Sequence, residues 1–139
     1  MNVLVDTPVW SLALRRIPEN LNREEQKIVA ELSELSKEGR IRIIGPIRQE
    51  LLSGIRLLEQ YEKLRTSLSA FRDEPLSTPD YEEAAKAGNR CRAQGITVTS
   101  VDILICAVAL SRSFHIFTTD HDFHDYASVL PIKLHAPRR

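Results

Sequence analysis

A run of apolar residues from Val101 to Leu110 constrains this chain most. The one polar side chain in the run is a carboxylic acid, Asp102. A helix that is apolar on every side packs in the middle of a domain, and this run is too short for a membrane span, which needs about 20 apolar residues. Ser100 is a favourable N-cap, which places Asp102 in the first turn, where the helix dipole stabilises negative charge. The sequence therefore predicts a carboxylate at the end of a buried helix.

Length and composition indicate an ordinary globular chain. Its 139 residues fit a single domain spanning residues 1–139. The chain carries 19 basic and 19 acidic residues, so the net charge gives no indication of a nucleic-acid binder. Cys91 and Cys106 form no CxxC pair, which argues against a disulfide framework and a zinc site. The apolar run Val3–Val5 is too short for a signal peptide, and we expect a cytoplasmic protein without a membrane segment.

Short apolar runs alternate with helical patterns along the chain. Strands are predicted at residues 3–5, 41–44 and 115–119, with a last edge strand at 132–135. Proline after the first two strands is typical of the first turn of a helix, and Thr78 is the expected N-cap of a helix with Pro79 at its first position. Strands that alternate with helices predict an α/β fold, with a mainly parallel sheet and helices on both faces.

The parallel topology brings four acids to one edge of the predicted sheet. Asp6 and Asp120 directly follow their strands. Glu50 lies in the first turns of the helix that follows residues 41–44. The helix of Asp102 must run back across the sheet to reach the next strand, so it starts at the same edge. All four acids therefore meet in the crevice where open α/β sheets bind ligands.

Four clustered carboxylates indicate a metal site. Like charges raise each other's pKa values, and a divalent cation removes this repulsion. Oxygen ligands with retained water suit Mg²⁺ or Mn²⁺ better than zinc or copper. Such ions polarise phosphoryl oxygens and activate water. The acids therefore favour metal-dependent hydrolysis of a phosphodiester.

Each acid also has an ordinary structural interpretation, which stays open. Asp6 can be explained as a helix cap and Glu50 as part of a solvated helix face. Asp102 can be explained as a charge partner of the helix dipole, and Asp120 as a turn residue. The hypothesis of a site therefore depends on their joint placement.

Four stretches of the sequence carry a resemblance to a known family. They are Val3-Leu4-Val5-Asp6-Thr7 and residues 49–54, 102–107 and 118–123. In these stretches the chain resembles the PIN-domain family, specifically VapC-type toxin ribonucleases, in the family's order and at its spacing. The resemblance implies a PIN-like three-layer sandwich and a Mg²⁺- or Mn²⁺-dependent endoribonuclease. The implied site comprises the metal-binding acids Asp6, Glu50, Asp102 and Asp120, the extra acid Asp122, and the supporting hydroxyls of Thr7 and Thr118.

The resemblance also implies partners. These are an RNA substrate, a small VapB-like antitoxin whose tail lies across the site, a second copy of the chain in a homodimer, and a larger assembly with the antitoxin. One residue departs from the family pattern: Pro8 stands where serine is usual, and it offers neither a hydroxyl nor an N–H. A catalytically weak or silent RNA- or partner-binding module on the same fold is therefore the alternative.

Other candidates are weaker. An aspartyl-phosphate phosphatase would need a second acid two residues after Asp6, where Pro8 stands. His121 and His124 are spaced for a soft-metal site, but a polar turn explains them better, because zinc needs further positioned ligands. Four arginines are candidates for binding RNA phosphates or antitoxin carboxylates, although ordinary surface charge explains them equally well: Arg15, Arg16, Arg48 and Arg56.

Overall fold

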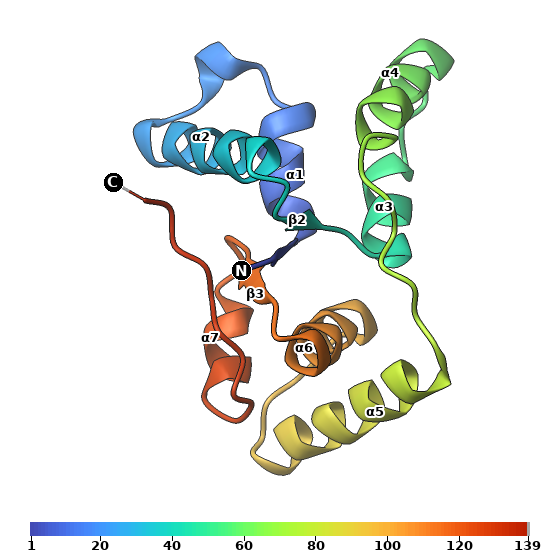
Figure 1. The fold of residues 1–139 in the computed structure, drawn as a ribbon, viewed down its shortest axis with the longest axis vertical. Coiled ribbons are helices and arrows are strands. Elements are labelled where there is room, and N and C mark those ends of the chain that lie inside the picture. Colours follow the sequence, from blue (N-terminus) through green and yellow to red (C-terminus); the bar gives the residue numbers. More distant parts are fainter. Residues whose placement is uncertain (139) are drawn as a thin grey trace.

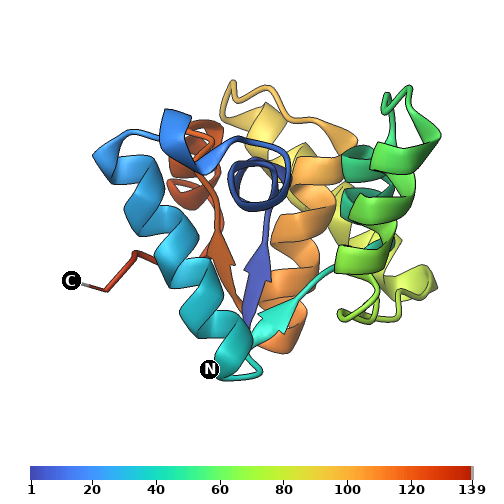
Figure 2. The same ribbon diagram turned by 90° about the horizontal axis from the view of Figure 1, so that it is seen from above.

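Three short parallel strands form the centre of the computed structural model, which describes residues 1–138. They are β1 (Val3–Val5), β2 (Ile41–Arg42) and β3 (His115–Phe117), arranged in the order β2–β1–β3. Leu4 of the middle strand lies opposite Arg42 on one side and opposite Ile116 on the other. Figure 2 shows the three arrows side by side and pointing the same way. All of β1 is buried, which is typical of a parallel strand covered on both faces.

Helices cover both faces of this sheet (Figure 1). Helices α1 (Thr7–Leu14) and α2 (Arg23–Lys37) lie on one side, joined by the short 3₁₀ helix η1 (Pro18–Asn20). On the other side lies α6 (Ser100–Arg112), backed by α5 (Thr78–Ala93). The remaining helices are α3 (Gly45–Leu52) and α4 (Leu58–Leu68), which stand beside α1, and α7 (Asp122–Ala127), which follows β3. The predicted three-layer α/β fold is therefore confirmed.

Helix α6 is the apolar rod that its sequence predicts. Every residue from Ile103 to Ala109 is buried. Helix α5 packs along it through small buried residues, among them Ala84 and Gly88. In residues 1–138, no helix combines the length and the apolar character that a membrane crossing requires.

The caps of α5 and α6 each lie one residue earlier than predicted. The N-cap of α6 is Thr99 and not Ser100, because Thr99 is extended and its hydroxyl accepts the N–H of Asp102 at 3.2 Å. The N-cap of α5 is Ser77 and not Thr78. Ser77 is extended and forms a reciprocal capping box with Asp80. In both places two adjacent hydroxyl residues compete, and the extended one is the cap.

Three predicted strands are shorter in the structure. Strand β2 ends at Arg42 and not at residue 44, and Ile43 forms one parallel bridge to Asp73. Strand β3 ends at Phe117 and not at residue 119. The expected edge strand at 132–135 is reduced to one parallel bridge between Leu134 and Ile116. Ile116 donates its N–H to Lys133 and accepts the N–H of His135 at this bridge, and the side chain of His135 pairs with Glu31 of α2.

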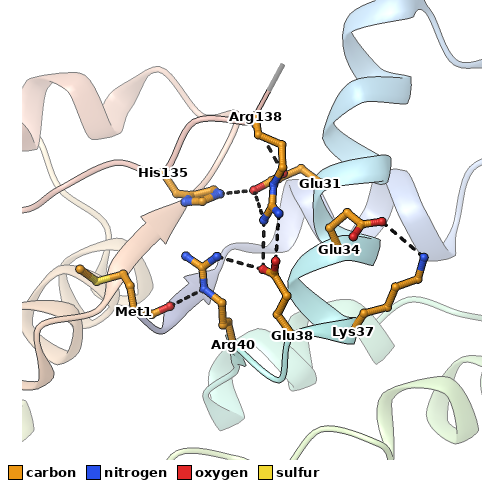
Figure 3. A network of polar contacts seen from close by, with 8 residues as sticks. All are labelled: Met1, Glu31, Glu34, Lys37, Glu38, Arg40, His135 and Arg138. Atoms are coloured by element: carbon orange, nitrogen blue, oxygen red, sulfur yellow. Dashed lines mark hydrogen bonds and ion pairs between the residues drawn. The ribbon is translucent and has the colours of Figure 1, made fainter.

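The C-terminal segment is held against α2 by a group of charged residues that we call the C-terminal clasp (Figure 3). Glu31 is only 3% exposed, and it pairs with His135 at 2.5 Å and with Arg138 at 2.7 Å. Arg138 also pairs with Glu38, which binds Arg40 at 2.9 Å. Burial by itself raises the pKa of Glu31, but the hydrogen bonds from Arg138 and His135 outweigh it and hold the pKa below its usual value. The buried carboxylate is therefore ionised and fully paired.

Candidate metal centre

Asp6 is a buried carboxylate at the end of the middle strand. It is 4% exposed. One oxygen accepts the N–H of Thr7 at 2.9 Å, and the other accepts the hydroxyl of Thr118 at 2.8 Å. Burial, with a smaller contribution from the negative charges of Asp102 and Glu50, raises the pKa of Asp6 to about 6 against these two hydrogen bonds. Asp6 therefore lies in the electrostatic field of two other acids.

Thr118 connects Asp6 to the acid that follows the neighbouring strand. Its hydroxyl oxygen accepts the N–H of Asp120 at 3.0 Å while its O–H donates to Asp6. Asp120 in turn accepts the N–H of Asp122 at 2.9 Å, which fixes the turn into α7. These bonds hold acids from β1, β3 and α7 in one place.

Asp102 lies in the first turn of α6, close to Asp120 and Asp122. Its carboxylate accepts the hydroxyl of Tyr126 at 2.9 Å. Partial burial raises the pKa of Asp102; hydrogen bonds from Tyr126 and Thr99 oppose this, while the charges of Asp120 and Asp122 add to it. The acid predicted at the end of the buried helix therefore faces two other acids.

Asp102, Asp120 and Asp122 form the candidate metal centre. One carboxylate oxygen of each lies within 4.8 Å of the others, so a single cation can be shared among them. The donors are all carboxylate oxygens, the ligands that Mg²⁺ and Mn²⁺ prefer. The residues present therefore fit a hard divalent cation.

The other predicted members of the site are placed differently. Glu50 is exposed on α3 and is outside the group of three, although its charge raises the pKa of Asp6. Thr7 holds Asp6 through its backbone N–H, not through the expected hydroxyl. Thr118 does use its hydroxyl.

The four predicted arginines lie in different settings. Arg15 and Arg56 line a cavity of about 710 Å³ between the end of α1 and helix α4. Arg16 lies 3.9 Å from Glu25. The guanidinium of Arg48 is engaged within the fold, where it binds Asp73 and the carbonyls of two neighbouring residues. Arg15 and Arg56 therefore remain the better candidates for contacts with a partner.

The two histidines beside the metal centre are stacked on each other. The rings of His121 and His124 lie 5.9 Å apart and are exposed. The candidate metal group found in residues 1–138 contains only aspartates. The polar turn is therefore the better interpretation of this histidine pair.

Tyr126 is a residue of the site that sequence reasoning missed. It lies 24 positions after Asp102, and its contact depends on how α7 packs. A signal was available, since a tyrosine on the buried face of a helix needs a partner for its O–H. The identity of that partner required the structure.

Comparison with known proteins identifies one family and several structures with a similar fold. The family model described as PIN domain matches residues 3–129. No curated protein matches the chain. The crystal structure of FitAcB from Neisseria gonorrhoeae has a TM-score of 0.76 at 23% identity, over 97% of each chain. VapBC2 from Rickettsia felis, bound to a promoter DNA fragment, has a TM-score of 0.76 at 17% identity, over 97% of this chain and 98% of the other. A toxin–antitoxin complex from Klebsiella pneumoniae has a TM-score of 0.64 at 18% identity, over 99% of each.

Proposed function

The chain belongs to the PIN-domain family, and on that premise we propose that it is a Mg²⁺- or Mn²⁺-dependent endoribonuclease, the toxin of a VapBC-type toxin–antitoxin pair. PIN domains are generally nucleases. Asp6, Glu50, Asp102 and Asp120 are the proposed catalytic acids, with Asp122 as a further metal ligand. The observation that carries the proposal is the group of three aspartates whose oxygens lie within 4.8 Å of one another.

The protein's own part in the reaction is to hold and orient these acids. Asp102, Asp120 and Asp122 would bind the ion, which supplies Lewis-acid activation of the phosphodiester and of a water molecule. Asp6 lies beside them in a fixed orientation, because Thr7 and Thr118 each bind one of its oxygens. In the metal-free chain the pKa of Asp6 is raised to about 6, and a cation bound beside it would favour the ionised carboxylate.

The test is cleavage of RNA by the purified protein. We expect a fluorogenic RNA oligonucleotide to be cut with Mn²⁺ or Mg²⁺ and to stay intact with EDTA. Asp102→Asn should lower the rate by about 100-fold or more, since a metal supplies several kcal/mol of transition-state stabilisation. Asp125→Asn is the matched control, because Asp125 is exposed on α7 and outside the metal group. Cleavage that survives EDTA or Asp102→Asn would contradict the proposal.

The alternative is a binding module that does not cut RNA. The observation that favours it is Pro8, which lies in the first turn of α1 beside Asp6 and provides no N–H. RNA binding without cleavage, at every metal concentration, would support the module. A DNA oligonucleotide of the same sequence shows whether binding or cleavage requires the 2′-hydroxyl.

A cavity lined by apolar and basic side chains is a candidate surface for the proposed antitoxin. The cavity of about 710 Å³ is lined by apolar side chains such as Leu57 and by the cations Arg15, Arg56 and Lys63. Leu57 is exposed, and so is its neighbour Leu58. An apolar segment with acidic side chains would fit this surface. If the proposal is right, Arg56→Glu should weaken the complex with a cognate antitoxin co-expressed with the chain, measured by co-purification.

Two further parts of the proposal follow from the same resemblance. We propose a homodimer, which sedimentation of the purified chain at several concentrations would test, and a larger assembly with the antitoxin. The expected location is the cytoplasm, where an RNA substrate and an antitoxin partner are both present.

A further inference from the structure

Tyr126 joins α7 to the metal centre. Its ring is buried, 1% exposed, and packs edge-on against Phe123 at 5.1 Å. Its hydroxyl donates a 2.9 Å hydrogen bond to Oδ2 of Asp102. A buried tyrosine that donates to a carboxylate cannot rotate away without leaving both groups unsatisfied.

Helix α7 carries both this tyrosine and one of the acids. Asp122 begins the helix, and Tyr126 follows four residues later. Residues at i and i+4 lie on the same face of a helix. The packing of Phe123 and Tyr126 into the core therefore places Asp122 beside Asp102 and places a donor on Asp102 at the same time.

The chemistry of the pair suits a positioning role. A tyrosine hydroxyl has an ordinary pKa of about 10, so it is protonated at neutral pH and acts as a donor. An ionised carboxylate has about four lone-pair sites, so one hydrogen bond fixes its rotation and leaves sites free for a cation.

We propose that Tyr126 is a positioning residue of the metal centre, whose hydroxyl holds Asp102 in the orientation that lets it share a cation with Asp120 and Asp122. This inference rests on the proposed function, since it requires a cation at these acids. Outer groups that orient a metal ligand typically change metal affinity by about 10- to 100-fold when they are removed.

The test is Mn²⁺ affinity measured by calorimetry on the full chain. Tyr126→Phe keeps the ring and removes the hydroxyl, and we expect its Kd for Mn²⁺ to rise by about 10- to 100-fold. The matched control is Tyr81→Phe, because Tyr81 is 55% exposed; its Kd should equal that of the wild type. RNA cleavage by Tyr126→Phe should fall at low Mn²⁺ and recover as Mn²⁺ is raised. A purely structural role would lower the melting temperature of the metal-free protein and leave the Kd unchanged.

A double-mutant cycle shows whether Tyr126 acts through Asp102. In the Asp102→Asn background, Tyr126→Phe should cause no further loss of Mn²⁺ affinity. An equal additional loss in that background would overturn the inference. If the wild type binds Mn²⁺ and Tyr126→Phe binds it equally well, the inference fails and the proposed metal centre stands. If the wild type itself binds no Mn²⁺, both fail.

A measurement without any variant covers the case in which Tyr126→Phe does not fold. The chain has three tyrosines, which can be labelled as 3-fluorotyrosine and followed by ¹⁹F NMR. During a Mg²⁺ titration, the Tyr126 resonance should shift along the binding curve while the Tyr81 resonance stays in place. A Tyr126 resonance that does not move as Mg²⁺ saturates the protein would contradict the inference.

Discussion

The hydroxyl of Thr118 donates a 2.8 Å hydrogen bond to Oδ2 of Asp6, which lies 112 residues earlier in the chain. The same hydroxyl oxygen accepts the N–H of Asp120 at 3.0 Å. One small side chain therefore sets the distance between the acids that follow two neighbouring parallel strands. The acids would otherwise separate, because like charges repel.

Thr118→Val should loosen this arrangement. Valine has nearly the same shape but no hydroxyl, so one buried oxygen of Asp6 loses its donor. We expect about 1–3 kcal/mol less free energy of unfolding and a Kd for Mn²⁺ raised by about tenfold or more. Urea unfolding and calorimetry measure the two effects. Thr97→Val is the control, because Thr97 is exposed; a Thr118 variant that behaves like it would show that the hydroxyl has no role.

Asp6→Asn should change how stability depends on pH. The pKa of Asp6 is raised from 3.8 to about 6 in the folded chain. Between these values the unfolded chain releases its proton while the folded chain keeps it, so the free energy of unfolding falls as pH rises from about 4 to 6. The fall amounts to roughly 3 kcal/mol for such a shift. Asparagine removes this contribution.

The measurement is urea unfolding in EDTA at several pH values between 4.5 and 7. Relative to the wild type, Asp6→Asn should become more stable by about 2 kcal/mol across this range. Asp125→Asn should follow the wild type. Parallel curves for the wild type and Asp6→Asn would show that Asp6 titrates normally in the fold.

The C-terminal clasp should contribute measurably to stability. Glu31→Gln removes the charge that pairs with His135 and Arg138 inside the protein. Arg138 is half exposed and can be solvated again, so we expect a loss of about 1–2 kcal/mol. Hydrogen exchange near residues 133–138 should accelerate. Glu34→Gln, on the same helix, breaks only an exposed pair with Lys37 and should change stability by less than about 0.5 kcal/mol; equal effects would contradict a special role for Glu31.

Gly88→Ala should stabilise the protein. A Cβ atom there would lie 3.6 Å from Val98 and 3.7 Å from Ile103, which are ordinary contacts, and 3.3 Å from the mobile end of Arg92. Alanine in a helix interior is favoured over glycine by about 0.5–1 kcal/mol. Gly54→Ala should instead lower the free energy of unfolding by about 1–2 kcal/mol. The φ of Gly54 is +82°, a conformation in which a residue with a Cβ atom is strained. Thermal unfolding separates the two, and destabilisation by Gly88→Ala would show that α5 and α6 need the glycine.

The fold could be predicted because its signals are local and strong. The apolar run at 101–110 can only be a buried helix packed against the sheet. The apolar run Val3–Val5 can only be a buried strand within it. The errors occur where two neighbouring residues offer similar chemistry, as at Thr99 and Ser100. The edge strand predicted at 132–135 is reduced to a single bridge. The pairing of His135 with Glu31 could not be predicted from local sequence, because it joins residues 104 positions apart.

For the candidate site, the sequence was sufficient to propose the acids but not the hydrogen bonds that hold them. Topology was sufficient to bring Asp6, Asp102 and Asp120 together, since each follows a strand or begins a helix at the same edge. The hydrogen bonds that hold them were not predictable from spacing. Tyr126 reaches Asp102 through the packing of α7, and Thr7 binds Asp6 with its amide and not with its hydroxyl.

Pro8 removes one N–H donor from the first turn of α1. A helix cap ordinarily accepts N–H groups from the second or third residue of the helix, and the second residue here has none. One oxygen of Asp6 therefore accepts the N–H of Thr7, and the other accepts the hydroxyl of Thr118. Serine at this position would add an amide that draws the carboxylate toward the helix axis. The proline thus keeps a competing donor away from the most deeply buried acid of the site.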